Sequence, residues 1–105
     1  MRIALEQPAA DGLDEVMAAL REWQDDDAPI QLHPGDLGWL WRFGATATAA
    51  ATRTWRRGGR LVAVGELDGP GLVRLAIAPD ARHDVALSQQ LAADGRTLAE
   101  QTAGE

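Results

Sequence analysis

Hydrophobic residues recur with two different periods over the first 24 residues of the chain. Ile3 and Leu5 alternate with other side chains, which predicts a short strand over 2–6 that Pro8 ends by removing a backbone donor. We expect this strand at a sheet edge. Apolar side chains then recur at the i, i+3, i+4, i+7 spacing of one helix face: Leu13, Val16, Met17, Leu20 and Trp23. The pattern predicts an amphipathic helix over 12–24.

Acidic residues mark both ends of this helix. Asp11 is placed to cap its first free amides. The run of three aspartates at 25–27 is unfavourable at a helix C-terminus, where the dipole is negative, and Pro29 follows it. A loop is therefore predicted over 25–38.

The next segment, GWLWRFG at 38–44, alternates with the period of a strand. In that conformation Trp39, Trp41 and Phe43 share one face. We interpret this face as core, because a small domain must bury most of its large rings. The alternative is a surface for a partner or ligand. The alanine and threonine residues that follow, at 45–54, favour a helix.

A β-hairpin is predicted from two runs rich in strand-forming residues, RLVAVGELDG at 60–69 and GLVRLAIAP at 71–79. They are joined by Asp68-Gly69-Pro70-Gly71, whose glycines allow the positive φ of a tight turn.

A second helix is predicted from Asp84 to Asp94, with Leu87 and Leu91 on one face and Gly95 as its C-terminal cap. It could resume through Leu98. The tail at 102–105 has no apolar anchor and is expected to fray.

Together these elements predict one domain over 1–105 of the α/β (α+β) class, with a mainly antiparallel sheet and two or three helices. The chain has 105 residues, of which 46% are hydrophobic and 25% charged, which is typical of a globular domain. No stretch approaches the ~20 apolar residues of a membrane-spanning helix, and the N-terminus lacks the apolar run of a signal peptide. A cytoplasmic location is expected.

The charge balance argues against two classes of partner. The formal net charge of −6 repels nucleic-acid phosphates and anionic lipid, so neither nucleic acid nor a membrane is expected. Four arginines at 53, 56, 57 and 60 could meet phosphate, but we interpret them as a solvated helix end that balances nearby acids. With no cysteine, the chain has no thiolate chemistry and no cysteine-bound zinc.

The segment LVRLAIAPDARHDVALSQQLAADG at 72–95 resembles the central motif of the GNAT acetyltransferases, so the expected fold is a partial GNAT-like one. In that family a strand ends near a proline, and a Q/R-x-x-G-x-G/A segment then wraps the pyrophosphate of coenzyme A and opens into a helix. The resemblance implies an N-acetyltransferase with acetyl-CoA as cofactor. The cofactor-binding positions that it implies are Ile77, Ala78, Arg82, His83, Asp84, Val85, Ala86 and Leu87.

The family's two glycines are missing from this loop. Val85 and Leu87 occupy their positions, where a Cβ obstructs the approach of backbone N–H groups to phosphate oxygens. Asp84 adds a negative charge where the pyrophosphate would lie. We therefore expect the isolated chain to be inactive and its binding of acetyl-CoA to be impaired.

The family also continues past this helix into a further strand, helix and strand. One hypothesis is thus an N-terminal, non-catalytic half of an acetyltransferase, whose partner is the missing C-terminal half. The alternative is a non-catalytic protein-interaction or dimerisation module, with a homodimer formed by strand addition at an exposed sheet edge.

Few side chains are candidates for chemistry. Glu66 is the candidate general base that takes the proton from an incoming amine, although we consider an outward-facing structural role more plausible. His33 and His83 show no metal-binding spacing, and the aspartates at 25–27 lack the pattern of a calcium loop, so no metal site is expected.

Overall fold

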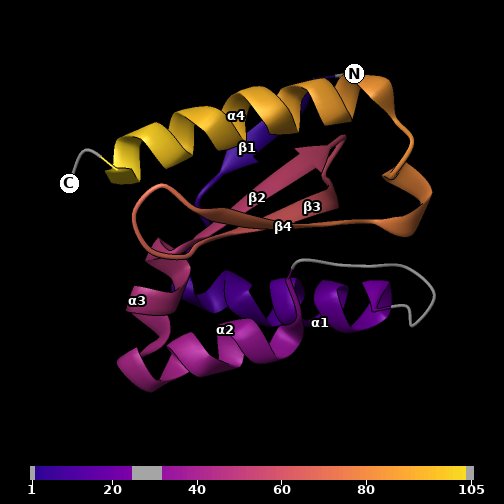
Figure 1. Cartoon of the computed structure of the whole chain (residues 1–105). Coiled ribbons are helices and arrows are strands. Elements are labelled where there is room, and N and C mark those ends of the chain that lie inside the picture. Colours follow the sequence, from indigo (N-terminus) through magenta and orange to yellow (C-terminus); the bar gives the residue numbers. More distant parts are fainter. Residues whose placement is uncertain (1, 25–31, 104–105) are drawn as a thin grey trace.

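A four-stranded antiparallel sheet organises the computed structural model, which describes residues 2–24 and 32–103 (Figure 1). Its strands are β1 (Ile3–Glu6), β2 (Thr52–Arg57), β3 (Arg60–Leu67) and β4 (Val73–Ile77). They lie in the order β1-β2-β3-β4, so each strand pairs with its neighbours in the sequence. The predicted α+β class with a mainly antiparallel sheet is confirmed.

Helices cover both faces of this sheet. The α-helices of the described residues are α1 (Leu13–Trp23), α2 (Pro34–Leu40), α3 (Ala45–Ala50) and α4 (Val85–Ala103), one more than the upper number expected. Three 3-10 turns each precede an α-helix of the described residues: η1 (Ala10–Gly12) precedes α1, η2 (Trp41–Phe43) precedes α3 and η3 (Pro79–Ala81) precedes α4. In Figure 1, α4 crosses one face of the sheet, and α1, α2 and α3 lie on the other. Residues 61–66 of β3 are consequently all buried. No helix of the described segments has the length and apolarity needed to cross a bilayer.

Trp55 of β2 fixes the packing of the sheet against α4. Its side chain is fully buried, and its Nε1 donates a hydrogen bond to Oδ2 of Asp94 at 2.9 Å. The ring lies so close to Gly65 that a Cβ there would be 3.0 Å from Cζ3 and 3.1 Å from Cη2. Gly65 is thus required by the indole that covers it.

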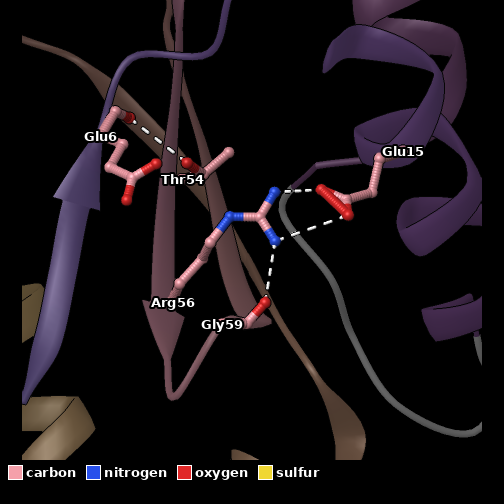
Figure 2. A network of polar contacts seen from close by, with 5 residues as sticks. All are labelled: Glu6, Glu15, Thr54, Arg56 and Gly59. Carbon is pink, nitrogen blue, oxygen red and sulfur yellow. Dashed lines mark hydrogen bonds and ion pairs between the residues drawn. The ribbon is translucent and has the colours of Figure 1, made fainter.

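A polar network joins β1, β2 and α1 (Figure 2). Arg56 forms an ion pair with Glu15 of α1 and donates to the carbonyl oxygen of Gly59 at 3.2 Å. The hydroxyl of Thr54 donates to the carbonyl oxygen of Glu6 at 3.4 Å. Arg56 therefore connects the first helix to the turn between β2 and β3.

Several sequence predictions agree closely with the structure. The strand over 2–6 is β1 and lies at a sheet edge, and the helix over 12–24 is α1. The hairpin is formed by β3 and β4, with positive φ at Gly69 and Gly71 in the turn that joins them.

The strand predicted over 38–44 is wrong, because this segment is helical. Pro34 occupies the first turn of α2, and the carboxylate of Asp36 accepts a hydrogen bond from the backbone N–H of His33 at 2.8 Å. These two features start a helix upstream of the aromatic run, which then ends in η2. The predicted loop thus gives way to α2 from residue 34, while 25–31 lie outside the described residues.

The interpretation of the three aromatic residues as core is also wrong. Trp39, Trp41 and Phe43 expose 64%, 45% and 61% of their surface. The guanidinium carbon of Arg42 lies 3.7 Å from the ring centroid of Trp39 and 4.4 Å from that of Phe43. The helical backbone places these rings on the surface instead of aligning them on one face of a strand.

Three helix ends differ from expectation. Asp11 lies within η1 and does not cap α1, whose N-cap residue is Gly12. Gly95 lies in the interior of α4, because the helix continues and buries Leu98. Thr102, in the tail expected to fray, belongs to α4, while 104–105 lie outside the described residues.

The alanine and threonine segment divides into α3 and the start of β2, so only its first half is the expected helix. The arginine cluster accordingly lies on β2 and the first residue of β3 instead of a helix end. Three of its four members balance acids as expected: Arg56 pairs with Glu15, Arg57 with Asp84 and Arg60 with Asp80.

Alanine substitutions at two glycines should have opposite effects on stability. We expect Gly65→Ala to lower the free energy of unfolding by about 1–3 kcal/mol, because the new methyl group collides with Trp55. Gly95→Ala should raise it by about 0.5–1 kcal/mol, because Gly95 is a helix-interior glycine where a Cβ meets no neighbour. Urea unfolding measures both, and equal effects of the two substitutions would contradict the packing described.

Candidate functional site

Glu66 is a buried acid near the C-terminal end of β3. It lies on β3, opposite Thr52 of β2 and Arg74 of β4, and exposes only 4% of its surface. Adjacent strand residues point to opposite faces, so Glu66 lies on the face opposite to Gly65, which contacts Trp55. The expected outward-facing role is therefore wrong, because the helices on that face cover the side chain.

Burial changes the acidity of Glu66. Loss of water around the carboxyl group raises its pKa to about 7, and the negative charges of Asp68 and Asp36 act in the same direction. Arg74 opposes them, but its Nε also donates to Oδ2 of Asp68 at 2.6 Å. Among the described residues, the Glu66 carboxyl group accepts no hydrogen bond that would stabilise its charge. A carboxyl group in this state can accept or release a proton near neutral pH.

The cofactor-binding positions implied by the GNAT resemblance lie together at one end of the sheet. Ile77 ends β4, Ala78 is buried, and η3 leads through Arg82 and His83 to the start of α4. Glu66 is not part of this group. Ile77 pairs with Ala63, three residues from Glu66 along β3, which corresponds to about 10 Å at the rise of a strand.

Asp84 fills the N-terminus of α4. Its Oδ1 accepts a hydrogen bond from the backbone N–H of Leu87 at 3.0 Å, and its Oδ2 pairs with Arg57 of β2. The hydrogen bond from Arg57 and that from the Leu87 amide lower the pKa of Asp84 to about 2. The carboxylate is therefore ionised at neutral pH and occupies the position at which a helix dipole favours an external anion.

The two positions that lack the family's glycines have different environments. Val85 is largely exposed in the first turn of α4, whereas Leu87 is fully buried in the core. Nearby, Nη2 of Arg82 is buried without a hydrogen-bond partner in the described part of the chain. The loop is thus held by its own carboxylate and by a core leucine.

Neither histidine belongs to a metal site in the described segments. His33 precedes α2, His83 lies on the loop before α4, and both are exposed. Within residues 2–24 and 32–103, no three histidine, cysteine, aspartate or glutamate side chains converge as metal ligands would. The aspartates at 25–27 lie outside the described residues.

Sequence reasoning missed two features of these sites. Arg57 closes the loop through Asp84, although 27 residues separate the two in the sequence. Arg42 lies between the rings of Trp39 and Phe43 on an exposed surface. Pro34 and Asp36, which start α2, were the available signal for the second feature.

Comparisons with protein-family models, with curated proteins and with solved structures find no match to this chain.

The raised pKa of Glu66 makes stability depend on pH. Its folded-state pKa of about 7 lies above the unfolded value, so the folded state binds more protons and the free energy of unfolding falls as pH rises from about 4.5 to 7. Glu66→Gln removes this dependence. We expect the variant to equal the native chain at pH 4.5 and to exceed it at pH 8 by up to about 3 kcal/mol.

Urea unfolding at both pH values measures this difference. Glu100→Gln, which removes an exposed acid from α4, is the matched control and should change stability equally little at each pH. If the Glu66→Gln variant is less stable than the native chain at pH 8, the ionised carboxylate stabilises the folded state and this prediction is wrong.

Proposed function

We propose that the chain is a GNAT-like N-acetyltransferase domain, the N-terminal non-catalytic half of an acetyl-CoA-dependent enzyme. In this role it supplies scaffold and acceptor-side surface, and the C-terminal half binds acetyl-CoA. The proposal includes a cytoplasmic location, which the absence of cysteine allows.

The succession of β4, η3 and α4 supports this proposal. A strand ends at Ile77, Pro79 follows in η3, and a long helix begins at Val85. This is the order of elements in the family's central motif. The sheet also has β4 at one edge, next to which the family's further strand would follow.

The observation that carries the non-catalytic part of the proposal is the state of the α4 N-terminus. Asp84 takes the hydrogen bond of the Leu87 amide that a pyrophosphate oxygen would need, and its charge repels such a group. Leu87 cannot become glycine without loss of a buried side chain, which costs about 3–5 kcal/mol in comparable cores. The side chains of this loop therefore stabilise the fold, and the loop is not open to a pyrophosphate.

Glu66 adds a candidate catalytic group to the same proposal. A carboxyl group with a pKa of about 7 is suited to take the proton of an acceptor amine as it attacks an acetyl group. This half is non-catalytic alone, and in the assembled enzyme it would contribute Glu66 as general base.

Restoring anion binding at α4 tests the proposal. Asp84→Ser keeps a side chain that can cap the helix, removes the negative charge and releases Arg57. We expect coenzyme A to shift the amide resonances of residues 85–88 in this variant, with a dissociation constant near 1 mM, and to leave the native chain unchanged.

Asp80→Ser is the matched control, because it removes an aspartate paired with Arg60 outside the helix N-terminus. It should not bind coenzyme A. If Asp84→Ser folds but shows no shift at 10 mM coenzyme A, the loop is not a closed cofactor site and the GNAT proposal loses its support.

The exposed aromatic residues favour a second candidate, a non-catalytic interaction module that forms a homodimer through its sheet edge and aromatic face. Trp39 and Phe43 are more than half exposed, and large rings that lie together on a surface commonly mark contacts between proteins. Burial of these rings would be stabilising, and in this fold only contact with another protein would bury them.

Sedimentation equilibrium tests the dimer directly. The module predicts a mass that rises towards twice 11.2 kDa with concentration and a dimer at least roughly tenfold weaker in Trp39→Ser. Val85→Ser, an exposed apolar residue at the start of α4, is the control and should leave the dissociation constant unchanged. A monomer at every concentration would exclude the homodimer.

A further inference from the structure

A pocket lies at the end of the sheet away from the start of α4. It has a volume of about 650 Å³ and lies where α3, the start of β2, the turn between β3 and β4 and the end of α4 meet. Figure 1 shows α3, this turn and the C-terminal end of α4 at the same end of the molecule. Pockets of 300–1,000 Å³ are of the size that holds small organic molecules.

The walls of this pocket are mainly small and apolar. Ala47 and Ala51 contribute from α3 and its end, Leu67 from β3, and Pro70 from the turn. Two contacts hold these walls together. The backbone N–H of Leu67 donates to the carbonyl oxygen of Ala51 at 2.8 Å, and that of Gly71 donates to the hydroxyl of Thr102 at 3.0 Å. The pocket is therefore built from elements that are already fixed to one another.

Arg53 supplies the charge of the pocket. Thr102 also lines it, but its hydroxyl accepts from Gly71 and donates to Ala99, so both of these contacts are internal. Nη1 of Arg53 donates to the carbonyl oxygens of Ala50 and Thr52, both at 2.8 Å, which fixes the position of the guanidinium group. Partial loss of water lowers the pKa of Arg53, although the group stays charged at neutral pH.

The other three arginines of the same cluster each have a carboxylate partner, and Arg53 has none among the described residues. Arg53 is thus an arginine without a carboxylate partner, within the described part of the chain, that lies beside an apolar pocket. Its Nε and Nη2 are the donors that a carboxylate binds in bidentate geometry.

We propose that this pocket is a binding site for a small carboxylic acid with an apolar body, whose carboxylate pairs with Arg53 and whose hydrocarbon part lies against Ala47, Leu67 and Pro70. Glu66 does not line this pocket, although its neighbour Leu67 does. The proposed site therefore does not involve the general base proposed for acetyl transfer.

Titration of the full chain with hexanoate, followed by amide NMR, tests the site. We expect saturable shifts at residues 47–53 and 67–71, with a dissociation constant of about 1 mM or below. Hexanamide has the same shape without the charge and should bind at least roughly tenfold more weakly. This comparison uses the native chain and does not depend on the folding of any variant.

Two substitutions test separately the charge of Arg53 and the space inside the pocket. Arg53→Gln should weaken hexanoate binding at least roughly tenfold, whereas Arg96→Gln, which removes an exposed arginine from α4, should leave it unchanged. Ala47→Leu should also weaken binding, because its larger side chain narrows the pocket without altering charge. Equal binding of hexanoate and hexanamide, full binding by Arg53→Gln, or shifts elsewhere on the chain would overturn the proposal.

Discussion

The packing of Trp55 against the backbone of Gly65 is the contact on which the arrangement of the sheet and α4 depends. An indole buried in this way removes a large apolar surface from water, but its N–H must find an acceptor. Asp94 provides that acceptor from the middle of α4, so one hydrogen bond at 2.9 Å sets where the helix lies along the sheet. The position of α4 then determines what meets its two ends.

Different contacts hold the two ends of α4 against the rest of the chain. At the start, Asp84 ties the helix to β2 through Arg57, and at the end Thr102 ties it to the turn after β3 through Gly71. The arginines of β2 and β3 are therefore used mainly to connect elements, with Arg53 as the exception. Glu66 differs from the paired acids, since it is buried and forms no ion pair within the described part of the chain.

The sequence predicted the elements whose patterns are local. The spacing of Leu13, Val16 and Leu20 located α1, and the glycines at 69 and 71 located the hairpin. The strand predicted for the aromatic run was wrong because alternation of large rings also fits an exposed helical turn. The capping by Asp36 decides in favour of the helix. The prediction that Gly95 ends the helix was wrong because burial of Leu98 offsets the cost of glycine within a helix. Neither the pair of Arg57 with Asp84 nor the burial of Glu66 could be predicted, because each depends on elements distant in the sequence.

The order of the strands also bears on how the chain folds as it is synthesised. β2, β3 and β4 are linked by short turns, so they can form quickly once residues 52–77 have been made. β1 is made first, but it pairs with β2, and the bond between Thr54 and Glu6 spans 48 residues. The apolar face of α1 is covered completely only when those strands have left the ribosome. The N-terminal quarter is therefore where nascent chains would be expected to associate or to recruit a chaperone.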